Sequence, residues 1–86
     1  MTKSMEEAIE RQQIRFSVQT VSFGIDGMIK NNNPYFFYSE IEEGDRQSKP
    51  CVLRKHVYDI VRILQNKYRG RAVVSRTPGG IVAHNI

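Results

Sequence analysis

The sequence predicts a single α+β domain over residues 1–86: a small antiparallel sheet of four to five strands with one main helix on one face. Three observations predict this fold class. Residues 54–70 have a clear helical period, several other segments are rich in β-branched and aromatic residues, and turn residues separate them. A chain of 86 residues has the length of one domain.

Composition places the chain among ordinary globular proteins. Hydrophobic residues make up 40% of the chain and charged residues 26%, with a net charge of +4. The one cysteine, Cys51, allows no internal disulfide, which favours a reducing, cytoplasmic location. The first residues, MTKSMEEAIERQQ, do not read as a signal peptide, and no apolar run reaches the ~20 residues of a membrane span. We therefore expect no membrane partner.

The main helix is predicted over residues 54–69. Val57, Ile60, Val61 and Leu64 recur at i, i+3, i+4 and i+7, so they share one face that should pack on the sheet. Gly70 then suits the left-handed residue that follows a helix.

The N-terminal third is predicted to hold a short helix and a strand. Ser4 and Glu7 fit a capping box, which indicates a marginal helix over residues 5–12 or, alternatively, a frayed tail. Residues 14–23, IRFSVQTVSF, have strand composition. Asp26-Gly27 then predicts a turn.

A second strand is predicted over residues 35–43, after an asparagine-rich loop that ends at Pro34. Its side chains alternate, so Tyr35 and Phe37 lie on one face and Phe36 and Tyr38 on the other. One pair of rings should meet the main helix. We expect the core to consist of the apolar face of the main helix, one of these two pairs of rings, and Ile14, Phe16 and Val18.

The remaining elements follow from turn residues. Gly44-Asp45 predicts a turn, and residues 47–53 an edge strand, because Pro50 lacks an N–H. Residues 71–76 and 81–83 form a predicted hairpin around Pro78-Gly79, a type II turn pair. The edge strand also offers unpaired backbone groups through which a homodimer could form.

Charge is concentrated in the C-terminal part of the chain. Residues 52–86 hold seven Lys or Arg and one acid, a net charge of +6, whereas residues 1–51 have a net charge of −2. A basic half points to a polyanionic partner, although a solvated surface is the simpler alternative. The side chains that could bind phosphates or base edges are Lys55, Tyr58, Arg62, Gln65, Asn66, Arg69, Arg71 and Arg76. In layout only, a basic helix followed by a basic hairpin resembles winged helices, without the earlier helices of their core.

A second candidate surface is the outer sheet face, where Arg15 would lie beside Phe36 and Tyr38. Rings with an arginine on a sheet can stack bases. The alternative is that these rings pack under the N-terminal helix or a second subunit.

No catalytic or metal-binding pattern is found. Cys51, His56 and His84 do not make up the three or four ligands of a typical zinc site, and no phosphate loop is present. We therefore expect no enzyme activity, no metal and no cofactor. The predicted function is a small basic module that binds nucleic acid or a phosphorylated ligand. The alternative is a protein-interaction module that inhibits or adapts a larger protein through exposed aromatic residues and a sheet edge.

Overall fold

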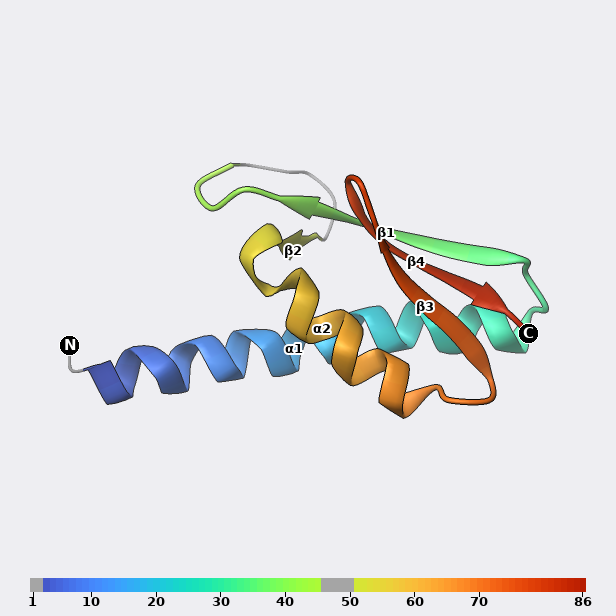
Figure 1. The fold of residues 1–86 in the computed structure, drawn as a ribbon, viewed down its shortest axis with the longest axis horizontal. Coiled ribbons are helices and arrows are strands. Elements are labelled where there is room, and N and C mark those ends of the chain that lie inside the picture. Colours follow the sequence, from blue (N-terminus) through green and yellow to red (C-terminus); the bar gives the residue numbers. More distant parts are fainter. Residues whose placement is uncertain (1–2, 46–50) are drawn as a thin grey trace.

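The computed structural model describes residues 3–45 and 51–86 and confirms the α+β class with a four-stranded sheet (Figure 1). No helix in these residues is long and apolar enough to cross a membrane. The elements in chain order are α1 (Lys3–Lys30), β1 (Tyr35–Ile41), β2 (Val52–Leu53), α2 (Arg54–Lys67), β3 (Ala72–Thr77) and β4 (Gly80–Asn85).

The sheet has the order β2-β1-β4-β3. β1 pairs antiparallel with β4, and β4 antiparallel with β3. β2 pairs with β1 in parallel, with Glu40 opposite Val52, so the prediction of a wholly antiparallel sheet is wrong. β4 occupies one edge of β1, so β2 takes the other. The ten residues between β1 and β2 exceed a tight hairpin turn, which is the connection that would impose an antiparallel return. As predicted, β2 lies at the sheet edge, whereas residues 47–50 of that predicted strand, Pro50 among them, lie outside the described residues.

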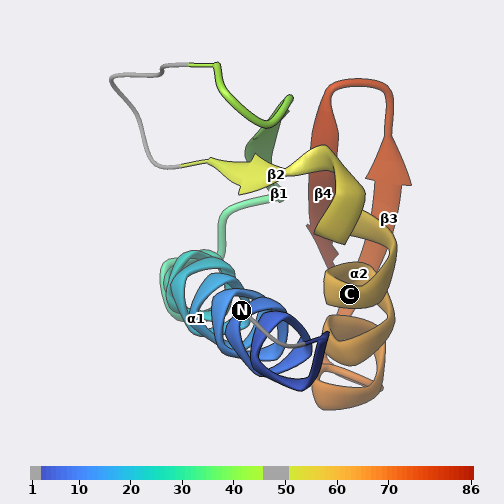
Figure 2. The same cartoon turned by 90° about the vertical axis from the view of Figure 1, so that its left-hand side faces the viewer.

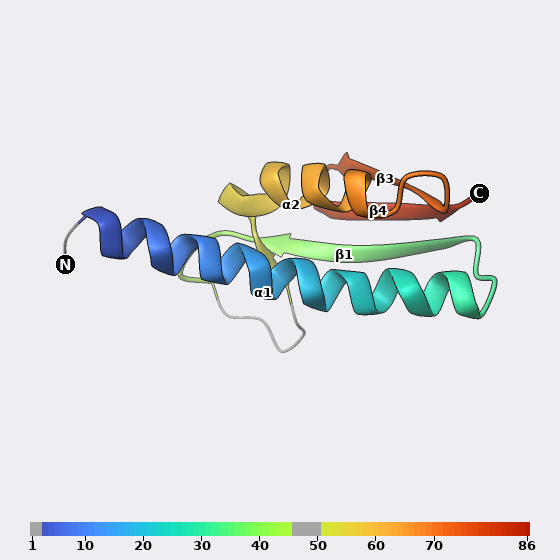
Figure 3. The same ribbon diagram turned by 90° about the horizontal axis from the view of Figure 1, so that it is seen from below.

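Both helices lie on the same face of the sheet and contact each other, as the end-on view in Figure 2 shows. Between them and the sheet lies one core. The central side chains of this core come from both helices and the sheet: Val21 and Ile25 of α1, Ile60 and Leu64 of α2, and Ile81 of β4. The N-terminal half of α1 extends beyond the sheet, which gives the molecule its long axis of 45 Å (Figure 3).

α1 replaces three predicted elements. Its 28 residues include the predicted helix 5–12, the predicted strand 14–23 and the predicted turn at Asp26-Gly27. The strand prediction is wrong because the apolar residues lie on two opposite sides of one helix. Ile14 and Val18 pack against the core, whereas Phe16, predicted to be buried, is exposed.

α2 agrees with its prediction. Val57, Ile60, Val61 and Leu64 are all buried. The helix ends at Lys67, and Gly70 follows with φ +83°, which suits a residue without a Cβ. α2 is nevertheless the shorter of the two helices, so it is not the main helix of the fold.

The rings of β1 alternate as predicted, and the inward pair is Phe36 and Tyr38. The Phe36 ring packs on α1 at Gly24, where an added Cβ would lie 2.1 Å from the ring. The alternative that these rings pack under the N-terminal helix therefore holds for Phe36, although Gly24 lies beyond the predicted helix 5–12. Tyr35 and Phe37 remain exposed on the opposite face of the sheet.

Tyr68 joins the end of α2 to α1. Its ring is fully buried, and its hydroxyl lies 2.7 Å from Asp26 Oδ1 and 3.0 Å from the carbonyl oxygen of Ser22, both acceptors for its proton. The guanidinium of Arg71 lies over the ring, 4.8 Å from its centroid. Burial raises the pKa of Tyr68, and the hydrogen bond to Asp26 adds to this rise.

The hairpin turn at Pro78-Gly79 is also confirmed, with Gly79 at φ +93°. Gly80 begins β4 where the strand meets β1 closely: a Cβ there would lie 2.2 Å from the carbonyl oxygen of Tyr38. This glycine therefore permits the β1–β4 pairing that joins the hairpin to the rest of the sheet.

Candidate nucleic-acid interface

The outer face of α2 and strand β3 together form a hollow of about 540 Å³. Tyr58, Arg62 and Gln65 follow each other along α2, and Arg76 reaches the same hollow from β3. The amide Nε2 of Gln65 donates to the carbonyl oxygen of Val74 at 2.9 Å, which holds helix and strand together. Four of the eight side chains predicted from the sequence therefore lie around one hollow.

The two arginines of this hollow have no acidic partner among the described residues, whereas other cations of α2 do. A guanidinium donates two parallel hydrogen bonds to a phosphate, and the exposed ring of Tyr58 can stack on a base. Two acids lie close. Asp59 lines the neighbouring groove together with Arg62, and Glu40 lines the next hollow beside Arg76, where its carboxylate pairs with Arg54 at 3.4 Å.

Two of the predicted residues have contacts within the fold. Lys55 Nζ lies 3.2 Å from Glu10 Oε1 and 3.4 Å from Glu43 Oε1, which joins the start of α2 to α1. The hydrogen bond between Lys55 and Glu10 raises the pKa of Lys55 and lowers the pKa of Glu10. Arg71, stacked on Tyr68, also donates to the carbonyl oxygen of Lys67.

The last two predicted residues are exposed outside the hollow, Asn66 on α2 and Arg69 in the turn that follows it.

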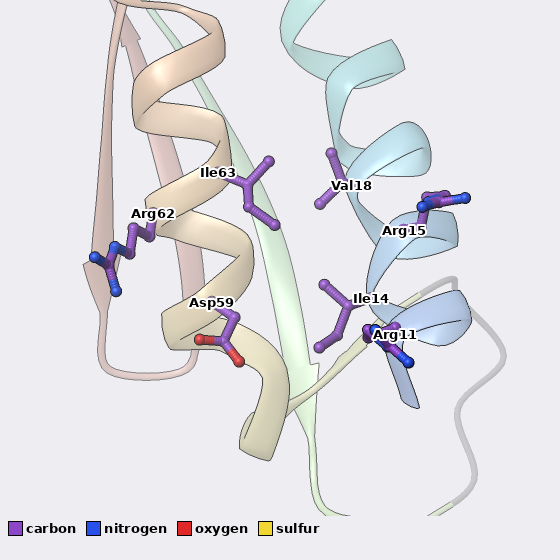
Figure 4. A pocket seen from close by; sticks show the side chains of 7 residues that line it. All are labelled: Arg11, Ile14, Arg15, Val18, Asp59, Arg62 and Ile63. Atoms are coloured by element: carbon purple, nitrogen blue, oxygen red, sulfur yellow. The ribbon is translucent and has the colours of Figure 1, made fainter. Parts of the chain in front are cut away.

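A groove of about 460 Å³ separates α1 from α2 on the other side of Arg62 (Figure 4). Ile14 and Val18 of α1 point across it toward Ile63, while Arg62 points toward the hairpin. Arg11 and Arg15 line the groove from α1, so α1 adds two cations to the basic surface. Sequence reasoning missed the place of Arg15 because it assigned residues 14–23 to a strand. It missed that of Arg11 because the helix predicted over residues 5–12 was not expected to continue beside α2.

The predicted sheet platform is not formed. Arg15 lies on α1, and Phe36 and Tyr38 face the core rather than solvent. The rings on the outer face are instead Tyr35 and Phe37. The alternation of these four rings was visible in the sequence, but which pair is covered depends on the side from which the helices pack.

His56 is a buried polar side chain in the first turn of α2. Its Nε2 lies 3.8 Å from Glu10 Oε1 and makes no hydrogen bond to a described residue. Within residues 3–45 and 51–86 no three His, Cys, Asp or Glu side chains are grouped so that they could hold a metal ion.

No protein-family model, curated protein sequence or solved structure matches this chain. The functional argument therefore depends on the side chains of the surface itself.

Proposed function

We propose that the α2–β3 surface binds the phosphate backbone of nucleic acid, with Arg62 and Arg76 as phosphate ligands and Tyr58 as a stacking ring. The observation that carries this proposal is the hollow in which these three side chains meet Gln65. Its arginines come from two different elements, and the hydrogen bond from Gln65 to β3 holds these two elements together before a ligand arrives. Such preorganisation lowers the cost of binding.

The surrounding charge supports a long polyanion rather than a single phosphorylated molecule. Arg69 is exposed in the turn after α2, and Arg11 and Arg15 lie across the groove on α1. Cations spread over a surface meet several phosphates in turn, and each contact releases counterions. A mononucleotide would use only part of this surface.

Fluorescence anisotropy with a short labelled duplex and a labelled single strand, each at several salt concentrations, tests this proposal. The double variant Arg62→Gln, Arg76→Gln removes two cations from the hollow; both are exposed, so the fold should persist. We expect weaker binding and, for duplex DNA, a salt dependence whose slope decreases by about 0.9 for each lost phosphate contact.

The matched control is Lys3→Gln, Lys30→Gln, which removes the same charge from the two ends of α1. It should bind nearly as the parent does. If both double variants lose equal affinity, binding reflects net charge alone and the hollow is not a site. Absence of binding at low salt would reject the proposal altogether.

A second candidate function is protein interaction through the outer sheet face, favoured by the exposed rings of Tyr35 and Phe37 beside Val73. Exposed aromatic residues at this density are typical of contact surfaces. Binding through this face would respond little to salt and would be lost in Phe37→Glu while persisting in the arginine double variant.

A further inference from the structure

We propose that α1 pairs with α1 of a second copy of this chain, antiparallel, with Phe16 at the two-fold axis. The contact surface is the outer stripe, which we define as Met5, Ile9, Phe16, Phe23 and Gly27. This inference is independent of nucleic-acid binding.

The outer stripe is a line of exposed side chains on one side of α1. Phe16 is 70% exposed, Phe23 83%, Met5 54% and Ile9 41%. At about 100° per residue, these positions fall within an arc of about 40°, because Ile9, Phe16 and Phe23 are seven residues apart. The buried residues Val21 and Ile25 lie on the opposite side.

Charged residues avoid this side of the helix. The same helical geometry places Asp26, Arg15 and the other charges of α1 at least about 80° from the centre of the stripe, except Lys30 in the last turn. Gln12, Gln13, Gln19 and Thr20 flank the stripe, and all four are uncharged.

The N-terminal part of α1 gives the strongest indication that the stripe is covered. No residue from 3 to 13 is buried, and this part extends beyond the sheet (Figure 3). Here the side that continues the core face carries Glu7, Glu10 and Arg11, whereas Met5 and Ile9 continue the outer stripe. A helical segment that is surrounded only by solvent needs no apolar side. The apolar side chains of Met5 and Ile9 therefore indicate that a partner covers the outer stripe.

The stripe is complementary to itself when reversed. Ile9 and Phe23 are equally far from Phe16, so in an antiparallel pair Ile9 faces Phe23 of the other copy, and Phe16 faces Phe16. Met5 then faces Gly27, where there is open space around the missing Cβ. The flanking glutamines meet uncharged residues, so no like charges oppose each other.

The contact is large enough for a specific dimer. Met5 to Gly27 spans about 33 Å of helix at 1.5 Å per residue. The two phenylalanines expose about 300 Å² in each copy, on a scale of about 200 Å² for a whole aromatic side chain. Met5, Ile9 and the flanking uncharged side chains together bring the paired surface of the two copies to about the 1,000 Å² of a specific interface.

Sedimentation equilibrium over a range of protein concentrations tests the pairing. We expect a dimer whose dissociation constant rises at least about 100-fold in Phe16→Glu, because two charges would meet at the axis. Circular dichroism should show unchanged folding, since Phe16 is exposed. The matched control Ile86→Glu places the same charge on an exposed apolar side chain outside the proposed surfaces and should remain dimeric.

Disulfide cross-linking tests the antiparallel geometry in a Cys51→Ser background. A cysteine at position 16 should link to itself in the dimer. A cysteine at position 9 should not, because the two copies of residue 9 lie about 21 Å apart along the axis, whereas a parallel pair would link both. A monomer at every concentration, or a dimer that persists in Phe16→Glu, would overturn the proposal. So would a monomer that binds lipid vesicles through the stripe.

Discussion

The two helices distribute their apolar residues differently. α2 has one main apolar side, formed by Val57, Ile60, Val61 and Leu64, which is buried. Its remaining surface is mostly polar and charged, with Ile63 exposed at the groove. α1 has two apolar sides, of which Val21, Ile25 and Met28 mark the buried one and the outer stripe the exposed one. A helix that contacts one surface needs one apolar side, so the second side of α1 points to a second contact.

The largest expected effect is the loss of stability when a buried side chain of α1 or α2 is truncated, compared with an exposed side chain of α1. Ile25→Ala and Leu64→Ala each remove a fully buried side chain and should reduce the free energy of unfolding by about 2–5 kcal/mol. Phe16→Ala should change it by less than about 0.5 kcal/mol in the monomer. Urea denaturation at low protein concentration measures both. An equal cost for Ile25→Ala and Phe16→Ala would show that the buried side of α1 is assigned incorrectly.

A smaller effect compares two glycines of the same helix. Gly24→Ala places a methyl group against the Phe36 ring and should destabilise the protein by about 1–3 kcal/mol through overpacking. Gly27→Ala meets open space and should stabilise it by about 0.5–1 kcal/mol, since alanine is the better helix former. Thermal and urea denaturation of the two variants should therefore shift in opposite directions. If both stabilise, the Phe36 ring does not pack at Gly24.

The smallest effect concerns the contact of Tyr68 with α1. Tyr68→Phe removes the hydroxyl that donates to Asp26 and should cost about 0.5–1.5 kcal/mol near neutral pH. Because the folded state raises the pKa of Tyr68, this residue contributes stability below the ordinary tyrosine pKa, and the contribution is lost as pH rises through the raised value.

Unfolding measured between pH 8 and 11 should show a weaker alkaline loss in Tyr68→Phe than in the parent. The control is Tyr38→Phe. Burial also raises the pKa of Tyr38, so this residue makes its own contribution to the alkaline loss of stability, and the control separates it from that of Tyr68. An alkaline profile unchanged by Tyr68→Phe would contradict the role of this hydroxyl.

The candidate site was partly visible in the sequence. Tyr58, Arg62 and Gln65 could be placed on one side of α2 from the helical period alone. Their meeting with Arg76 could not, because it depends on how β3 packs beside α2 after the turn at residues 68–71. Lys55 carries the same charge as Arg62, yet only the fold brings it to Glu10 and Glu43.

For the fold, local pattern by itself determined α2, β1 and the β3–β4 hairpin. Each of these has one dominant period or a turn with specific backbone requirements, as at Gly79. The tertiary structure alone decided α1, because a helix with two apolar sides has no single period and resembles an alternating strand over residues 14–18. The position of β2 likewise depended on which edge of β1 was left open by β4, and its parallel direction on a connection too long to act as a hairpin turn. Contacts between distant residues select among local conformations that the sequence pattern leaves equally open.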